Sequence, residues 1–378
     1  MKIIGLMSGT SMDGITAALT AISESNNGIS VDLLDYETRP YPEKVKRELL
    51  ELTEGGDVET LCKVNFAVGE QFALAAESVI GNGKEVKLIG SHGQTVCHLS
   101  GKRCGNSTYT LQIGEPDVIA ERTGIRTIAD FRPRDIAAGG EGAPLIPYVD
   151  YKLFQSESRN RVALNLGGIA NVTYLPAGGE KEDVLAFDTG PGNMVIDQLV
   201  RKTTDGEKEF DEGGNIAAKG NVDEEFLAWL MDNSYVKKTP PKSTGRKDFG
   251  RSYAEEVEEK GRKLGLSSGD ILASVTAFTA ESVKYGCEKY LGGIDEMIAA
   301  GGGTKNDFLM QELRRRSGLK VVTTKDFGIP PEAKEAVGFA ILAYETSRGK
   351  SSNIPGATGA KRFVPLGKIS PGEVDFNE

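Results

Sequence analysis

Residues 161–175 read RVALNLGGIANVTYL, an apolar run, two glycines and a second apolar run. We predict a buried strand over 161–166, a turn at Gly167-Gly168 and another strand over 172–175. A third strand over 184–187 ends in the sequence DTGPG. This part of the chain therefore begins with three consecutive strands that are joined by short, partly glycine-rich connections.

The N-terminus repeats this pattern, with a strand predicted over 2–7 (KIIGLM), a turn over 9–14 and strands over 15–22 and 30–36. Each half then alternates helices and strands. We predict helices over 61–80, 117–123, 253–264, 271–291, 307–316 and 332–347, and strands over 86–90, 297–300 and 319–322. The repetition predicts a duplicated α/β architecture with a cleft between two lobes. Residues 139–147 (GGEGAPLIP) are the best hinge candidate.

Composition indicates an ordinary globular protein of about two domains. The chain has 378 residues, 39% hydrophobic residues and a net charge of −10. This acidic balance disfavours nucleic acid or an anionic membrane as the main partner. We predict no signal peptide and no membrane span. Four cysteines without a C-x-x-C pair favour free thiols and a cytoplasmic location.

Glycine is unusually frequent, at 47 residues, and it gathers in four bursts that follow predicted strands, at 8–14, 165–171, 188–193 and 301–306. Glycines let backbone N–H groups approach a phosphate, and a nearby carboxylate can hold Mg²⁺ through water or take a proton. One such burst is usually a tight turn, but four of them favour a ligand site. The Walker and dinucleotide motifs are both incomplete, because Tyr344 stands where a Walker loop needs glycine and Asn306 replaces the last fingerprint glycine.

Longer motifs carry a family resemblance along nearly the whole chain. They are GLMSGTSMDGI (5–15), SHGQTVCH (91–98), LQIGEPDVIAERTG (111–124), DFRPRDIAAGGEGAPLIPYVD (130–150), NLGGIANVTYL (165–175), FDTGPGNMVID (187–197), PPKSTGR (240–246), AAGGGTKNDFLM (299–310) and EAVGFAILA (335–343). The sequence resembles the 1,6-anhydro-N-acetylmuramic acid kinases of the hexokinase–Hsp70–actin group. This resemblance implies a two-lobed, ribonuclease H-like duplicated fold with ATP in an interdomain cleft. We expect an N-terminal lobe of residues 1–130 plus about 345–378, and a C-terminal lobe of residues 131–344.

The resemblance also implies a reaction. ATP, water and 1,6-anhydro-N-acetylmuramic acid would give ADP and N-acetylmuramic acid 6-phosphate, in a step of cell-wall sugar recycling. Asp188 matches the family's catalytic base for the water that attacks C1; the alternative is an Asx turn that closes the strand. Mg²⁺ is expected on the ATP phosphates rather than on a protein metal site.

Binding residues follow from the same resemblance. The expected nucleotide-binding residues are Gly9, Thr10, Ser11, Met12, Asp13, Gly14, Ile15, Thr16, Asn165, Gly167, Gly168, Gly301, Gly302, Gly303 and Asn306. The expected sugar-binding residues are His92, Arg132 and Glu335. Arg132 could instead form a structural ion pair, and Glu335 could be a solvated charge. A zinc site at His92, Cys97 and His98 is disfavoured because it lacks enough ligands.

Other functions stay open at this point. Glu141 stands where much of the family has Gln, so a different anhydrosugar such as levoglucosan is an alternative substrate. The chain could also be a nucleotide-dependent binding module of the same superfamily, or a plain kinase of an open hexose. A homodimer is plausible from the resemblance.

Overall fold

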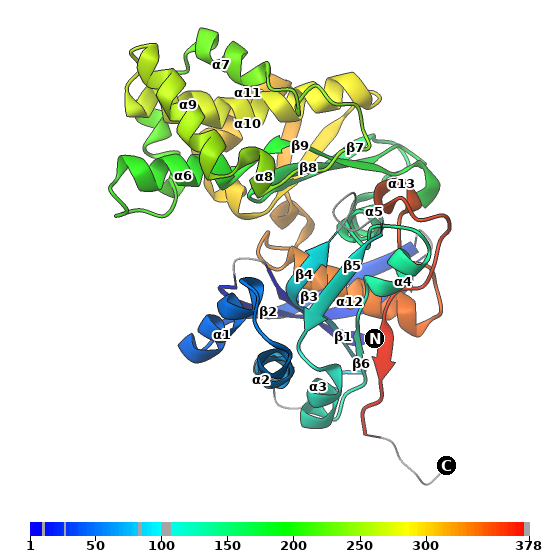
Figure 1. The fold of residues 1–378 in the computed structure, drawn as a ribbon. Helices are drawn as coiled ribbons and strands as arrows, with labels where there is room; N and C mark the ends of the chain where they lie inside the picture. Colours follow the sequence, from blue (N-terminus) through cyan, green and yellow to red (C-terminus); the bar gives the residue numbers. More distant parts are fainter. Residues whose placement is uncertain (10–11, 26–27, 82–84, 100–106, 374–378) are drawn as a thin grey trace. The chain divides into compact units, whose positions relative to one another are not determined.

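The computed structural model describes residues 1–9, 12–25, 28–81, 85–99 and 107–373. The chain forms two compact units (Figure 1). Unit 1 comprises Met1–Leu153 and Gly328–Glu378, and unit 2 comprises Phe154–Phe327. The sequence placed the boundaries near 130 and 344 instead.

Unit 1 is built on one mixed sheet of seven strands. Its strands are β1 (Lys2–Ser8), β2 (Gly14–Ser25), β3 (Gly28–Pro40), β4 (Leu88–Leu99), β5 (Tyr109–Ile113), β6 (Thr127–Ala129) and β12 (Lys368–Ser370). The order is β12-β6-β4-β1-β2-β3, and β5 pairs with β4. Strands β1, β2 and β3 form an antiparallel meander, whereas β4 runs parallel to β1 and β6 parallel to β4.

Helices cover this sheet on both faces. The helices of unit 1 are α1 (Glu43–Thr53), α2 (Val58–Ile80), α3 (Pro116–Thr123), α4 (Pro133–Ala137), α5 (Ile146–Phe154, which ends one residue into unit 2), α12 (Lys334–Ser347) and α13 (Pro355–Thr358). Ile4 and Leu6 of β1 share a buried core with Phe72 of α2. Gly5 points to the opposite face, where a Cβ would lie 1.7 Å from the carbonyl oxygen of Ala336 in α12. Helix α12 therefore packs directly on the strand backbone.

Unit 2 repeats the arrangement. Its strands are β7 (Arg161–Leu166), β8 (Ile169–Leu175), β9 (Leu185–Pro191), β10 (Glu296–Ala300) and β11 (Lys320–Thr323), in the order β11-β10-β7-β8-β9. Its helices are α6 (Asn193–Thr203), α7 (Glu224–Met231), α8 (Arg246–Phe249), α9 (Arg251–Lys263), α10 (Ser268–Tyr290) and α11 (Asp307–Ser317). Strands β7, β8 and β9 are antiparallel, and β7, β10 and β11 are parallel.

The two sheets share one topology. The segment β3-β2-β1-β4-β6 of unit 1 matches β9-β8-β7-β10-β11 of unit 2 in strand order and in every strand direction. The duplicated α/β fold that the sequence predicted is thus confirmed. The shift in unit boundaries has a physical reason: α5 and α12 supply core residues to unit 1, such as the buried Val149 beside Gly338.

Two local expectations were wrong. The strand predicted over 86–90 instead spans Leu88–Leu99, because its second half pairs with β5. Residues 139–147 lie inside unit 1 rather than at a unit boundary. The fully buried carboxylate of Asp135 holds this loop, since it accepts hydrogen bonds from Gly142 N, Asn353 Nδ2 and Thr358 Oγ1, at 2.9, 2.8 and 2.8 Å.

Candidate functional site

Asp188 lies within β9 rather than at its end. Residue Asn171 of β8 pairs with Asp188, and Ala170 pairs with Gly190, so Thr189 is the extra residue of a bulge. Bulges re-aim neighbouring side chains. The Asp188 carboxylate forms no Asx turn; its Oδ2 accepts a 2.8 Å hydrogen bond from the N–H of Thr244, which is 56 residues further along. Among the described residues, the other oxygen, Oδ1, has no hydrogen-bond partner.

Burial dominates the electrostatic environment of this carboxylate. Burial raises the pKa of Asp188 to about 6, although the Thr244 N–H and the Lys242 ammonium act in the opposite direction. A carboxyl group with a pKa close to neutrality is suited to exchange protons with a reacting water.

Three glycine-rich loops of unit 2 meet beside β7. The N–H groups of Gly192 and Asn193 donate to the carbonyls of Gly168 and Gly167, at 2.9 and 2.8 Å. A Cβ on Gly192 would lie 2.2 Å from the Gly167 oxygen, so this approach requires glycine. Gly301 adopts a left-handed φ of 85° and packs against Asn165, where a Cβ would lie 2.7 Å from Oδ1. The predicted residues of the second phosphate loop and of the adenosine segment therefore adjoin one another.

The predicted adenosine segment divides into exposed and structural positions. Gly302 is exposed, and a Cβ there would meet no atom within 4 Å. Gly303 is buried against Leu166. The side chain of Asn306 caps α11 by accepting a 2.9 Å hydrogen bond from Leu309 N. Its oxygen thus has a structural task, and only Gly302 offers an open backbone surface.

The first predicted phosphate loop connects β1 and β2. Thr10 and Ser11 lie outside the described residues. Met12 and Ile15 bury their side chains in the unit 1 core, so only their backbones can face a ligand. Gly14 packs against the backbone of Arg39, and Thr16 pairs with Thr38 across β2 and β3. Asp13 is exposed, 3.8 Å from Lys46 Nζ. Gly9 is anchored through its carbonyl, which accepts from the buried Gln94.

The three predicted sugar-binding residues gather in unit 1. The Nδ1 of His92 donates to the carbonyl of Gly93 (2.8 Å), which leaves Nε2 to accept from the Arg132 guanidinium (2.8 Å). Burial and Arg132 lower the pKa of His92 to about 3, so the ring is neutral. Arg132 also donates to Gly142 O at 2.9 Å, while its buried Nε has no partner among the described atoms.

Glu335 completes this cluster from the first turn of α12. Burial raises the pKa of Glu335, and the charges of Lys334 and Arg132 oppose this effect. Lys334 itself forms a buried ion pair with Asp150, at 2.6 Å. Glu335 is thus a partly buried carboxylate beside a guanidinium rather than a fully solvated charge.

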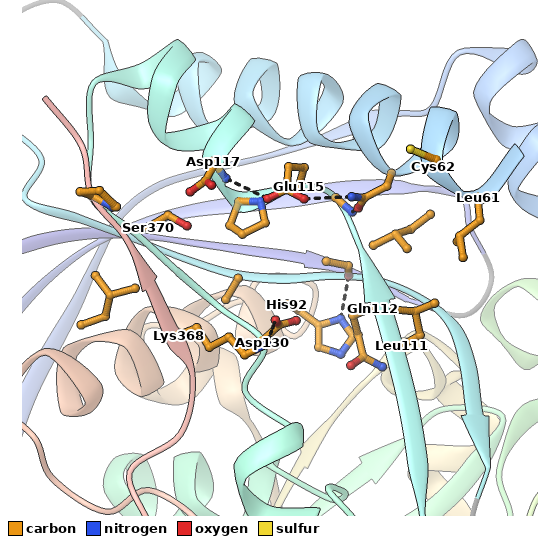
Figure 2. Close-up of a pocket in the computed structure, with 18 of the residues that line it drawn as sticks. Leu61, Cys62, His92, Leu111, Gln112, Glu115, Asp117, Asp130, Lys368 and Ser370 are labelled. Carbon is orange, nitrogen blue, oxygen red and sulfur yellow. Dashed lines mark hydrogen bonds and ion pairs between the residues drawn. The ribbon is translucent and has the colours of Figure 1, made fainter. Parts of the chain in front are cut away.

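A cavity of about 670 Å³ borders His92 in the same unit, between α2, α3, β5 and β12 (Figure 2). Its polar side chains are largely paired with one another, as in Lys368 with Asp130 and Asn65 with Glu115.

Glu141, the residue that departs from the family pattern, is exposed, and its backbone N–H donates to the carbonyl of Thr358.

No cluster of three or more potential metal ligands occurs among the described residues. Cys62, Cys97 and Cys287 are free thiols, and Cys104 lies outside the described part of the chain. Within that part, no helix has the length and apolarity to cross a membrane.

Two mixed sheets that share a five-strand topology define a duplicated α/β protein. A model of the Anhydro-N-acetylmuramic acid kinase family matches residues 1–372. The chain therefore belongs to the anhydro-N-acetylmuramic acid kinase family and is a kinase.

Individual relatives agree with this assignment. Anhydro-N-acetylmuramic acid kinase from Caldanaerobacter subterraneus subsp. tengcongensis is 48% identical over 381 residues, which covers 97% of this chain and 96% of that protein. The protein of the same name from Bacillus cereus strain AH820 is 42% identical over 384 residues, covering 98% of this chain and 99% of its own length. The family resemblance stated from the motifs is thereby confirmed.

Sequence reasoning did not single out several residues that hold the candidate site. Gln94 and Ser8 form a buried hydrogen bond, at 2.7 Å, behind the first loop. Tyr235, Lys242 and Thr244 surround Asp188. Gln94 and the PPKSTGR stretch lay inside quoted motifs, but motif membership assigns no role to a side chain.

Proposed function

We propose that this protein converts 1,6-anhydro-N-acetylmuramic acid, ATP and water into N-acetylmuramic acid 6-phosphate and ADP. The observation that carries the proposal is the carboxylate of Asp188, which is held through one oxygen by Thr244 while burial raises its pKa to about 6. Such a group can remove a proton from water near neutral pH.

The water step needs this base. The water oxygen bonds to C1 of the sugar, the C1–O6 bond breaks, and Oδ1 of Asp188 takes the water proton, as a base does in an inverting glycosidase. O6 then bonds to the γ-phosphorus and ADP leaves. The proton on Asp188 returns to solvent, so the enzyme is regenerated. General-base assistance of this kind contributes about 10²–10⁴-fold to the rate.

The glycine loops are the proposed nucleotide contacts. Backbone N–H groups of residues 9–16 would hold the β- and γ-phosphates. Asn165, Gly167 and Gly168 would contact the phosphates as a second loop. The open backbone at Gly302 would lie against the adenosine. Mg²⁺ is the proposed counterion of the ATP phosphates. When bound, Mg²⁺ neutralises phosphate charge.

Arg132 is the proposed partner of the lactyl carboxylate. Its buried Nε lacks a partner among the described atoms, and a buried unpaired N–H calls for an acceptor. His92 fixes the guanidinium through its Nε2, and Glu335 supplies an acceptor for a sugar hydroxyl or amide. We further propose that the enzyme works in the cytoplasm, as a homodimer.

The test is a coupled assay of ADP release with Mg²⁺, ATP and either 1,6-anhydro-N-acetylmuramic acid or levoglucosan. We expect release with the first sugar and a 6-phosphorylated product. Release with levoglucosan alone would reassign the substrate. ATP hydrolysis that no anhydrosugar changes would instead favour a nucleotide-dependent binding module.

A further inference from the structure

Lys242 occupies an aromatic cage that no part of the proposed reaction uses. Its ammonium lies 5.9, 5.1 and 5.5 Å from the ring centroids of Phe187, Tyr235 and Tyr290. The ammonium also donates a 2.9 Å hydrogen bond to the carbonyl of Val236. Cation–π contacts with several partly desolvated rings hold an ammonium firmly. We call these three rings the lysine cage.

The residues around this cage also hold Asp188. Phe187 precedes Asp188 in β9, and the backbone N–H of Asp188 donates to the carbonyl of Lys242 at 3.2 Å. The Tyr235 hydroxyl donates to the carbonyl of Asp188 at 3.1 Å. Two residues beyond Lys242, the Thr244 N–H donates to Oδ2 at 2.8 Å. The position of Lys242 therefore determines where the backbone donor of Thr244 stands.

Charge links the same two residues. Burial lowers the pKa of Lys242 to about 8, and the Asp188 carboxylate counteracts this decrease. At neutral pH the ammonium is therefore charged and favours the ionised form of Asp188. Two further charged groups face this region: the exposed Lys238, 5.3 Å from the Tyr235 centroid, and Asp248, which accepts from Thr244 Oγ1 at 2.8 Å. Burial raises the pKa of Tyr235, so its hydroxyl stays neutral.

We propose that Lys242 is a positioning residue for Asp188: the lysine cage fixes its ammonium so that residues 242–244 orient the carboxylate and its charge keeps that carboxylate ionised. This inference rests on the proposed function, in which Asp188 is the base. Lys242 contacts no reacting atom in this account, so its removal should change the basicity and orientation of Asp188 rather than nucleotide binding.

The test compares pH profiles of kcat/KM for the anhydrosugar at saturating ATP. Lys242→Gln removes the charge, while its amide can still donate to Val236 O, so the fold should persist. Lys242→Arg keeps the charge. Lys238→Gln is the matched control, because it removes a neighbouring exposed lysine that also lies over Tyr235. We expect the acid limb of Lys242→Gln to move up by about 1 pH unit, with lower kcat and an ATP KM within about threefold.

An acid limb of Lys242→Gln that coincides with those of the wild type and Lys238→Gln would overturn the inference. If Lys242→Gln fails to fold, Lys242→Arg decides: an unchanged acid limb supports the inference, and a displaced one contradicts it.

An activity-independent readout separates this inference from the proposed function. The stabilising effect of Asp188→Asn grows with pH and levels off above the folded-state pKa of Asp188, so the pH at which it levels off reports that pKa without substrate. That pH should rise in the Lys242→Gln background, and no change would contradict the role of Lys242. A wild type that releases no ADP with any anhydrosugar would count against the proposed function alone.

Discussion

The backbone N–H of Thr244 donates a 2.8 Å hydrogen bond to Oδ2 of Asp188, so a loop that follows β9 by more than fifty residues holds one oxygen of the carboxylate. The other oxygen has no partner among the described residues. An acid held on one side and open on the other can accept a proton without losing its orientation.

Replacing this carboxylate should slow turnover strongly without disturbing nucleotide binding. In Asp188→Asn the amide oxygen can still accept from Thr244, but the base is lost, so kcat should fall by about 10²–10⁴-fold. Nucleotide affinity, measured by calorimetry, should stay within about threefold. Asp248→Asn is the matched control, because this exposed carboxylate accepts from the hydroxyl of the same Thr244. An equal decrease of kcat in the two variants would show that Asp188 is not the general base.

The same substitution should stabilise the protein above neutral pH. Because burial raises the folded-state pKa of Asp188 from 3.8 to about 6, its contribution to stability is complete below about pH 4 and is lost as the pH rises through 6. Asp188→Asn should therefore raise the free energy of unfolding by about 1–3 kcal/mol at pH 8, and by little at pH 4. Denaturant titrations at both pH values measure this difference. A difference in the free energy of unfolding that does not change with pH would show that burial does not raise the pKa of Asp188.

A methyl group added at Gly302 should leave the fold intact but should clash with the bound nucleotide. No atom lies within 4 Å of a Cβ built at Gly302, and the same holds for Gly293, which is also exposed in unit 2. Gly302→Ala should keep the melting temperature within a few degrees and weaken ATP binding about tenfold or more. Gly293→Ala should change neither quantity. Unchanged ATP affinity in Gly302→Ala would place the adenosine elsewhere.

Arg132 should determine the affinity for the anionic sugar. A charge-assisted hydrogen bond contributes about 1.5–3 kcal/mol, so Arg132→Gln should raise the sugar KM by about 10–100-fold and leave the ATP KM nearly unchanged. The exposed Arg134, two residues away, provides the control variant Arg134→Gln. A sugar KM that rises equally in both variants would show that the loss of one positive charge, rather than a specific contact of Arg132, weakens sugar binding.

Sequence reasoning predicted the elements that depend on local pattern. The strand Arg161–Leu166 was predicted residue for residue. The helix predicted over 61–80 begins three residues earlier, at Val58, and the side chain of its N-cap residue Asp57 accepts a hydrogen bond from Thr60 N. It also selected His92, Arg132 and Glu335, which the fold brings into one cluster.

What the sequence could not supply was long-range pairing. Thr244 meets Asp188 across 56 residues, and Gln94 supports Gly9 across 85. Neither pair leaves a periodic signal. The boundaries of the units were also displaced, because α12 packs on Gly5 and Gly90 through backbone contacts that hydrophobic spacing does not encode.

The central claim is that water opens the anhydro bridge with help from Asp188 while O6 accepts the phosphoryl group. It is tested most directly by a reaction in ¹⁸O-labelled water, quenched before the free anomeric oxygen exchanges with solvent. We expect one ¹⁸O atom at C1 of the 6-phosphorylated sugar for each ADP formed, and formation of both products about 10²–10⁴-fold more slowly in Asp188→Asn. ADP formation with an unlabelled sugar, or with the label in inorganic phosphate, would contradict the account.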